Sequence, residues 1–188
     1  MELQQDGPWL DHCESCLLNP PAFDRCLCGF RYEFPVRELV AAFKFQGNFA
    51  AGRTLAQLLA KRLSSAWNNA ASTPVLIPVP LHTSRLRERG FNQSVLLARE
   101  LALRCNLGLS LQHCRRLRAT QSQRGLRAGE RSTNLQGAFA LAQPRHIFPH
   151  VVIVDDVVTT MATVDTLAQL YRRAGTRHVD VVCLARVS

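Results

Sequence analysis

Short apolar runs alternate along this chain with stretches in which apolar residues recur every three or four positions. Val151-Val-Ile-Val154 is the most continuous run and is typical of a strand covered on both faces. Strands are expected at about 26–33, 75–80, 151–154 and 178–184, and helices at about 36–45, 49–67, 92–104 and 163–174. Strands that alternate with helices predict an α/β fold with a mainly parallel central sheet flanked by helices.

The segments between these elements are polar or interrupted by proline. Residues 1–24 contain Pro20-Pro21 and predict an irregular N-terminal segment that precedes a main domain over 25–188. Loops are expected at about 64–74 and 81–91. The stretch 115–135 is rich in arginine and has little apolar periodicity, so it predicts an exposed loop.

Length and charge narrow the class of protein. The 188 residues suit one domain with a short appendage, and no apolar run approaches the ~18 residues of a membrane span. The start, Met1-Glu-Leu-Gln-Gln-Asp6, is unlike a signal peptide, so we expect a cytoplasmic protein. The net charge is +9, yet residues 51–150 alone carry +12, which predicts a polyanionic or phosphorylated ligand. Only 2 of the 23 cations are lysine; this arginine preference favours phosphate recognition or reflects genomic base composition.

Four of the seven cysteines cluster near the start of the chain, as Cys13-x-x-Cys16 and Cys26-x-Cys28. The first pair fits a zinc knuckle, whereas a gap of one residue suits chelation poorly. In an alternative interpretation, Cys26 and Cys28 share one strand face with Phe30 and Tyr32 as a core stripe. The remaining thiols are expected to be ordinary buried residues.

Candidate chemistry is concentrated in Val151-Val-Ile-Val-Asp-Asp-Val-Val-Thr-Thr-Met-Ala-Thr163. Asp155 and Asp156 follow a buried strand, and the turn behind them opens a helix whose N-terminal N–H groups can bind phosphate. Carboxylates beside such a turn suit a sugar phosphate, with Thr160 and Thr163 as further donors. Alternatively, Asp156, Thr159 or Thr160 only caps the helix, which leaves the second aspartate unexplained.

This segment resembles the phosphoribosyl-pyrophosphate (PRPP) signature of type I phosphoribosyltransferases. Four further segments complete a resemblance to the ComF/GntX family of phosphoribosyltransferase-like proteins, which is linked to competence and DNA utilisation: Ile77-Pro-Val-Pro-Leu81, Arg89-Gly-Phe-Asn-Gln-Ser94, Arg118-Ala-Thr-x-x-Gln123 and Asn134-Leu-Gln-Gly-Ala-Phe139. The Arg89 segment also fits a plain loop in which Asn92 caps the next helix. The resemblance implies a type I phosphoribosyltransferase-like fold.

The resemblance also implies roles for individual residues. Asp155 and Asp156 would be the catalytic carboxylates, on the ribose hydroxyls and any Mg²⁺ bound with PRPP. The 5′-phosphate would be held by Thr159, Thr160, Met161, Ala162 and Thr163. The pyrophosphate would be held by Leu81, His82, Arg85, Arg87 and Arg89. A flexible hood over the site would include Arg118, Thr120, Gln123, Arg131 and Asn134. In this fold, surrounding charge stabilises an oxocarbenium-like transition state.

Two positions depart from the family pattern. Met161 stands where the family turn has glycine, and a methionine there is expected to crowd the phosphate. Relatives carry further cysteine knuckles before the one that matches Cys13 and Cys16. We therefore expect a truncated zinc finger, in which these two cysteines alone leave a Zn²⁺ site incomplete.

Three functions fit these observations. The first is a ComF-like protein that binds a phosphoribosyl ligand and serves the use of imported DNA, with single-stranded DNA and a DNA-processing helicase as partners. The second is an active phosphoribosyltransferase of nucleotide salvage, although the tail Ala185-Arg-Val-Ser188 offers little to recognise a base. The third is a non-catalytic module that binds single-stranded DNA, although the stretch 115–135 has no aromatic residue for stacking.

Overall fold

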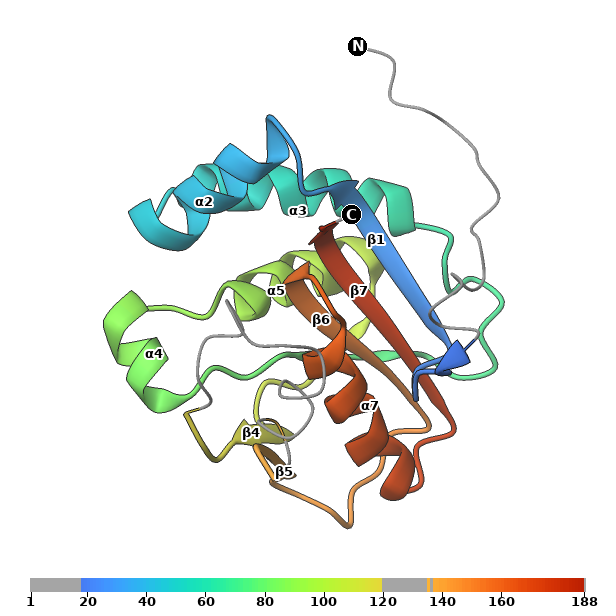
Figure 1. Cartoon of the computed structure of the whole chain (residues 1–188). Helices are drawn as coiled ribbons and strands as arrows, with labels where there is room; N and C mark the ends of the chain where they lie inside the picture. Colours follow the sequence, from blue (N-terminus) through green and yellow to red (C-terminus); the bar gives the residue numbers. More distant parts are fainter. Residues whose placement is uncertain (1–17, 120–134, 136, 188) are drawn as a thin grey trace.

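The structure is a computed structural model that describes residues 18–119, 135 and 137–187 (Figure 1). Its strands are β1 (Arg25–Arg31), β2 (Val75–Pro78), β3 (Gly108–Leu109), β4 (Cys114–Arg116), β5 (Phe139–Leu141), β6 (His150–Val158) and β7 (His178–Arg186). Its helices are α2 (Val36–Gln46), α3 (Phe49–Leu63), α4 (Thr83–Arg89), α5 (Gln93–Cys105) and α7 (Ala162–Arg173). None of the helices described is long and apolar enough to cross a membrane.

The central sheet has five strands in the order β1-β7-β6-β2-β3, and every neighbouring pair in it is parallel. Helices α3 and α5 cover one face, with α2 packed on α3, and α7 covers the other (Figure 1). The expected α/β class with a parallel central sheet flanked by helices is therefore confirmed. A separate antiparallel ribbon of β4 and β5 lies on the α7 side.

Burial on both faces explains the most apolar stretch of the sequence. Val151 and Ile153 pack in the cluster under α7, whereas Val152 and Val154 pack in the cluster under α3 and α5. All four side chains are fully buried, as a strand covered on both sides requires. The predicted strand is thus confirmed, and it continues to Val158.

One expected loop contains a helix. The segment 81–91 holds α4, which His82 caps by accepting a hydrogen bond from the Ser84 N–H, and which ends at Gly90 in a left-handed conformation (φ 80°). None of the residues of α4 is buried. Because sequence prediction of helices depends on a buried apolar face, this exposed helix gave no periodic signal. Helix α3 also ends four residues before its expected limit at residue 67.

The predicted stripe of β1 divides between two clusters. Cys26 and Cys28 pack on the α7 side, whereas Phe30 and Tyr32 pack against the cluster under α3 and α5. Cys26 and Cys28 are free thiols. Cys13 and Cys16 lie outside the described residues, so the zinc expectation stays a prediction.

Helix α2 is held against α3 by a close contact at Gly52. A Cβ atom at this position would lie 2.6 Å from the ring of Phe43, closer than packed atoms allow. The Phe43 ring is buried and also contacts Phe91, with ring centroids 5.6 Å apart. Glycine at position 52 therefore fixes where the end of α2 lies relative to the sheet.

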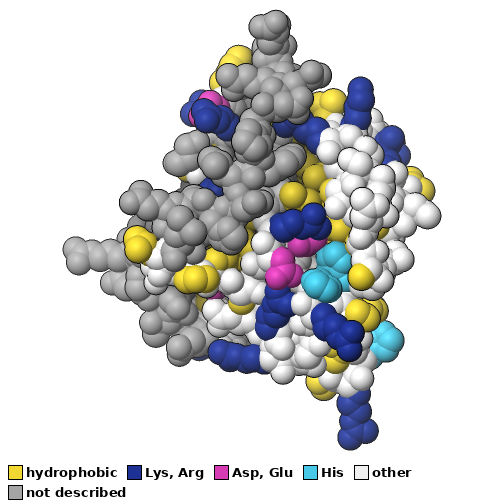
Figure 2. All heavy atoms as spheres, turned by 90° about the vertical axis from the view of Figure 1, so that its right-hand side faces the viewer, with side chains coloured by type: hydrophobic (Ala, Val, Ile, Leu, Met, Phe, Trp, Pro, Cys, Tyr) yellow, Lys and Arg dark blue, Asp and Glu magenta, His cyan; other side chains and the backbone are white. Residues whose placement is uncertain are grey.

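At the amino ends of the strands, a buried carboxylate on β7 joins β1, β6 and the turn that follows α3. Asp180 is 2% exposed and accepts hydrogen bonds from Arg25 Nη2 (2.6 Å), Trp67 Nε1 (2.8 Å) and His150 Nε2 (3.0 Å). Burial opposes ionisation of Asp180, but these hydrogen bonds outweigh it and hold its pKa well below the usual range. Figure 2 views this side of the molecule, where acidic and histidine side chains lie beside basic ones.

The substitution Asp180→Asn should lower the free energy of unfolding by about 2–4 kcal/mol at pH 7, because it leaves buried partners without their carboxylate. The lowered pKa makes this stabilisation complete above about pH 4, the unfolded value, and it declines as the pH falls further. Urea unfolding at pH 7 and pH 3 measures both effects. Asp24→Asn, at an exposed carboxylate, is the control and should cost less; an equal cost would contradict the assignment.

Candidate functional site

A crevice opens at the carboxyl ends of the strands, between β2 and β6. The connection from β2 to β3 crosses one face of the sheet through α5, whereas the connection from β6 to β7 crosses the other through α7. Chain segments therefore diverge between these two neighbouring strands, which is where open α/β sheets bind their ligands. The cavity here has a volume of about 630 Å³.

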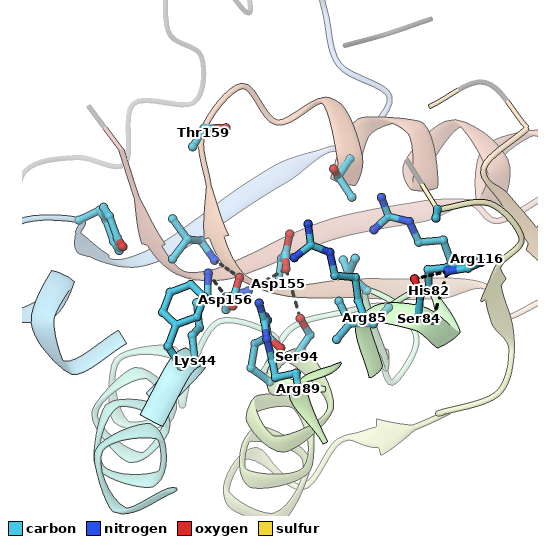
Figure 3. A pocket seen from close by; sticks show the side chains of 18 of the residues that line it. Lys44, His82, Ser84, Arg85, Arg89, Ser94, Arg116, Asp155, Asp156 and Thr159 are labelled. Carbon is cyan, nitrogen blue, oxygen red and sulfur yellow. Dashed lines mark hydrogen bonds and ion pairs between the residues drawn. The ribbon is translucent and has the colours of Figure 1, made fainter. Parts of the chain in front are cut away.

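Asp155 and Asp156 line this cavity from β6 (Figure 3). Oδ1 of Asp155 accepts hydrogen bonds from Ser94 Oγ (3.2 Å) and from the Asp156 N–H (2.9 Å). Asp156 is only 4% exposed, and its Oδ1 accepts a hydrogen bond from the Val157 N–H (2.6 Å). Both expected carboxylates thus reach the cavity, although they lie within β6 and not beyond its end.

The two carboxylates have different electrostatic surroundings. Lys44, in the last turn of α2, places Nζ 2.8 Å from Oδ2 of Asp156. Asp155 is half-buried; burial, followed by the neighbouring charge of Asp156, raises its pKa to about 7, and Lys44 partly offsets these effects. Asp155 is therefore partly protonated near neutral pH, so the pair carries less than two full negative charges.

Basic side chains face the carboxylates from α4. Arg85 and Arg89 line the cavity, one helical turn apart, together with Leu81 and His82 at the start of the segment. Arg87 lies on α4 but does not line the cavity, because a residue two positions along a helix faces away from its neighbours at i and i+4. Four of the five residues expected to hold pyrophosphate are therefore brought together.

The turn after β6 brings only part of the expected phosphate loop to the cavity. Thr159 and Thr163 line it, whereas Thr160 is exposed and does not. Met161 and Ala162 pack against the apolar cluster under α7. The Met161 side chain thus packs against this cluster and is not part of the cavity lining, and whether it crowds a bound phosphate stays a prediction.

Met161 nevertheless keeps the backbone conformation that glycine favours. It is the N-cap residue of α7, with φ 59° and ψ −2°, in the left-handed region. No side-chain hydrogen bond caps this helix end. The alternative interpretation, in which Asp156, Thr159 or Thr160 serves only as the cap, is therefore not what the structure shows. Asn92, in contrast, does cap α5, by accepting a hydrogen bond from the Ser94 N–H (2.9 Å).

Sequence reasoning gave no individual role to several polar residues of the cavity, among them Lys44, Ser94 and Arg116. Ser94 stands in a family segment, and Lys44 is one of only two lysines, which are signals that could have pointed to them. Arg116 comes from β4, close enough to Asp155 and Arg85 for their charges to affect its pKa, which burial lowers. Among the expected hood residues, Arg118 is exposed; Thr120, Gln123, Arg131 and Asn134 lie outside the described residues.

The carboxylate pair does not fit a divalent cation bound directly between its two members. Three of its four oxygens already accept a hydrogen bond or pair with Lys44. In the described part of the chain, no group of three or more His, Cys, Asp or Glu residues is arranged to hold a metal ion. Mg²⁺ prefers a near-octahedral shell of oxygens, which this arrangement does not offer.

No protein-family model matches the chain, but curated relatives do. Competence protein F of Haemophilus influenzae is 36% identical over 182 residues, which cover 95% of this chain and 80% of that protein. The chain belongs to the ComF/YhgH family of competence and DNA-utilisation proteins. DNA utilization protein YhgH of Salmonella typhi is 39% identical over 93% of this chain and 77% of its own length. The resemblance read from the sequence is thereby confirmed.

Solved structures similar to this ComF/YhgH member include hypoxanthine phosphoribosyltransferases. The Trypanosoma cruzi enzyme, in a ternary complex with substrates, is 21% identical, with a TM-score of 0.45 over 72% of this chain and 76% of that one. The Staphylococcus aureus enzyme is 14% identical, with a TM-score of 0.42 over 70% of this chain and 61% of that one. Both TM-scores are below 0.5, so the likeness to these enzymes is partial.

The left-handed backbone at position 161 gives a stability prediction. Met161→Gly should be more stable than Met161→Ala by about 1 kcal/mol, because both lose the side chain but only glycine adopts this conformation without strain. Urea unfolding measures the difference. Ala162→Gly, at the next residue with an ordinary helical backbone, is the control and should lose stability. Equal stabilities of the glycine and alanine variants at position 161 would show that the backbone there is not left-handed.

Proposed function

We propose that this ComF/YhgH member binds a phosphoribosyl ligand, PRPP or a related sugar phosphate, in the crevice between β2 and β6. The observation that carries the proposal is an acidic pair that shares one cavity with arginines at the carboxyl ends of parallel strands. The relatives are named for competence and DNA utilisation, and we propose the same role for this chain. A DNA-processing helicase as partner stays a prediction.

The charges of the cavity support a ligand with both hydroxyls and phosphates. Carboxylates accept hydrogen bonds from a ribose diol, and Asp155 Oδ2 accepts none among the described contacts. Arg85, Arg89 and Arg116 can bind phosphate oxygens with planar, charge-assisted hydrogen bonds. Basic side chains outnumber the acidic ones around the described cavity, which favours a ligand with net negative charge.

The same arrangement can assist transfer of the ribosyl group. In such a transfer the bond from C1′ to the pyrophosphate oxygen breaks, and a bond from C1′ to the acceptor nitrogen forms. Asp155 and Asp156 can stabilise positive charge that develops on the ribose ring, while Arg85 and Arg89 stabilise the departing pyrophosphate. Release of pyrophosphate from PRPP in the presence of a nucleobase would distinguish salvage activity from binding alone.

Calorimetry with PRPP tests the proposed site. The double substitution Arg85→Ala, Arg89→Ala should weaken binding roughly a hundredfold or more, since each charge-assisted hydrogen bond contributes about 1.5–3 kcal/mol. Arg87→Ala is the matched control: it removes an equal charge from the same helix, outside the cavity, and should weaken binding less than threefold. Absence of binding by the unaltered chain, or equal losses in all variants, would rule out this site.

A second candidate function is binding of single-stranded DNA, and exposed aromatic side chains in and around α2, of which Phe45 lines the crevice, favour it. Phe34, Phe45 and Phe49 are 80%, 68% and 55% exposed. The Arg89 guanidinium lies over the Phe45 ring, 5.5 Å from its centroid. Aromatic rings beside arginines are the combination that binds bases and phosphates of single strands. These phenylalanines supply the stacking groups that the arginine-rich stretch 115–135 lacks.

Fluorescence anisotropy with a labelled single-stranded oligonucleotide tests this function. The affinity should fall steeply and linearly on a log–log plot as salt increases. Phe45→Ala with Phe49→Ala should weaken binding by about tenfold or more at constant salt, because each stacked base contributes about 1–3 kcal/mol. Leu103→Ala removes an exposed apolar side chain from α5 and serves as the control. A flat salt response would exclude the electrostatic part of this function.

A further inference from the structure

Lys44 lies where a cation is needed, beside a carboxylate that is nearly inaccessible to water. Its Nζ is 2.8 Å from Oδ2 of Asp156, and most of its side chain is buried. This oxygen has no other partner among the described residues. A buried carboxylate without a countercharge is strongly disfavoured, so Lys44 supplies a charge that Asp156 requires.

The other oxygens of the pair leave little room for a metal ion. Oδ1 of Asp155 accepts two hydrogen bonds, from Ser94 and from the backbone of Asp156, and Oδ1 of Asp156 accepts one from Val157. A divalent cation bridging the carboxylates would have to displace the ammonium group or lie beside it with like charge. Only Asp155 Oδ2 faces the cavity without a described partner, and one oxygen does not make a Mg²⁺ site.

The position of Lys44 is set by packing that does not involve the crevice. The preceding residue, Phe43, is buried against Gly52 and Phe91, so the last turn of α2 cannot slide along α3 without a clash. The helix then ends at Gly47 in a left-handed conformation, whose N–H bonds to the carbonyl of Ala42. A lysine near a helix C-terminus also lies at the negative end of the helix dipole. The ammonium group is therefore held in place before any ligand arrives.

We propose that Lys44 is the resident cation of the acidic pair, in the place of a divalent metal, so that the pair binds a ribose diol without metal coordination. The binding of a ribose diol rests on the proposed function. The role of Lys44 as the cation of the acidic pair does not depend on it. PRPP can still bring a cation on its own pyrophosphate, because the proposal concerns only metal bound directly by the two aspartates.

Binding of Mn²⁺, a paramagnetic substitute for Mg²⁺, tests the central claim without any sugar phosphate. In the unaltered chain, electron paramagnetic resonance should detect no Mn²⁺ binding that is lost on the substitution Asp156→Asn. Lys44→Met should bind Mn²⁺ at least tenfold more tightly, and adding Asp156→Asn should abolish that gain. Lys61→Met removes the chain's other lysine, which is exposed on α3, and should behave as the unaltered chain. Lys44→Gln is measured in parallel, since it keeps a hydrogen-bonding group beside Asp156 if the methionine variant folds poorly.

Ribose 5-phosphate, which lacks the pyrophosphate that chelates metals, tests the consequence for the ligand. Calorimetry should give the same affinity for the unaltered chain, within twofold, in the presence of Mg²⁺ and in the presence of a metal chelator. Lys44→Gln should weaken binding in the chelator at least tenfold, and Mg²⁺ should restore part of it. Mn²⁺ binding by the unaltered chain that Asp156→Asn removes would overturn the inference. Failure of both ribose 5-phosphate and PRPP to bind would overturn the proposed function, while the Mn²⁺ result would still decide the role of Lys44.

Discussion

Two carboxylates near the end of a fully buried strand impose the main constraint on this molecule. Strand β6 is covered on both faces up to Val154, so the aspartates that follow begin in surroundings that disfavour charge. Lys44 on α2 forms an ion pair with Asp156, and Ser94 on α5 donates a hydrogen bond to Asp155. Their contacts require α2 to be held near the end of β6, and the close approach of Phe43 to Gly52 provides that restraint. The charge at the site therefore depends on how the core packs in this fold.

The features that could be predicted from the sequence are those with a local signal. The run Val151-Val-Ile-Val154 identified the central strand, and the spacing of apolar residues identified four of the helices. Helix α4 has no buried face, so nothing in its pattern separates it from a loop or shows that Arg87 faces away from Arg85 and Arg89. Lys44 could not be assigned to the site because its contact with Asp156 depends on how α2 packs, which no local pattern records.

Met161 shows how a departure from a family motif can leave its geometry intact. Substituting a glycine is expected to change the backbone, yet the residue keeps φ 59° and directs its side chain to the apolar cluster under α7. A left-handed conformation in a non-glycine residue costs about 1–2 kcal/mol and persists only where neighbouring structure enforces it. Here the enforcing elements are β6 and α7, which fix both ends of the turn. The turn is thus set by the packing of the two elements more than by the identity of the residue between them.

The two ends of the sheet illustrate how a site differs from a structural network of the same residue types. At the amino ends, Asp180 is surrounded by donors from Arg25, Trp67 and His150, and its charge is fully compensated within the protein. The hollow beside it, of about 460 Å³, therefore offers little to an incoming ion. At the carboxyl ends, basic groups exceed acidic ones and one carboxylate oxygen faces the cavity without a described partner. A ligand of opposite charge can neutralise an excess of charge that the protein itself does not, which is why we propose binding at the crevice and a stabilising role for the Asp180 network.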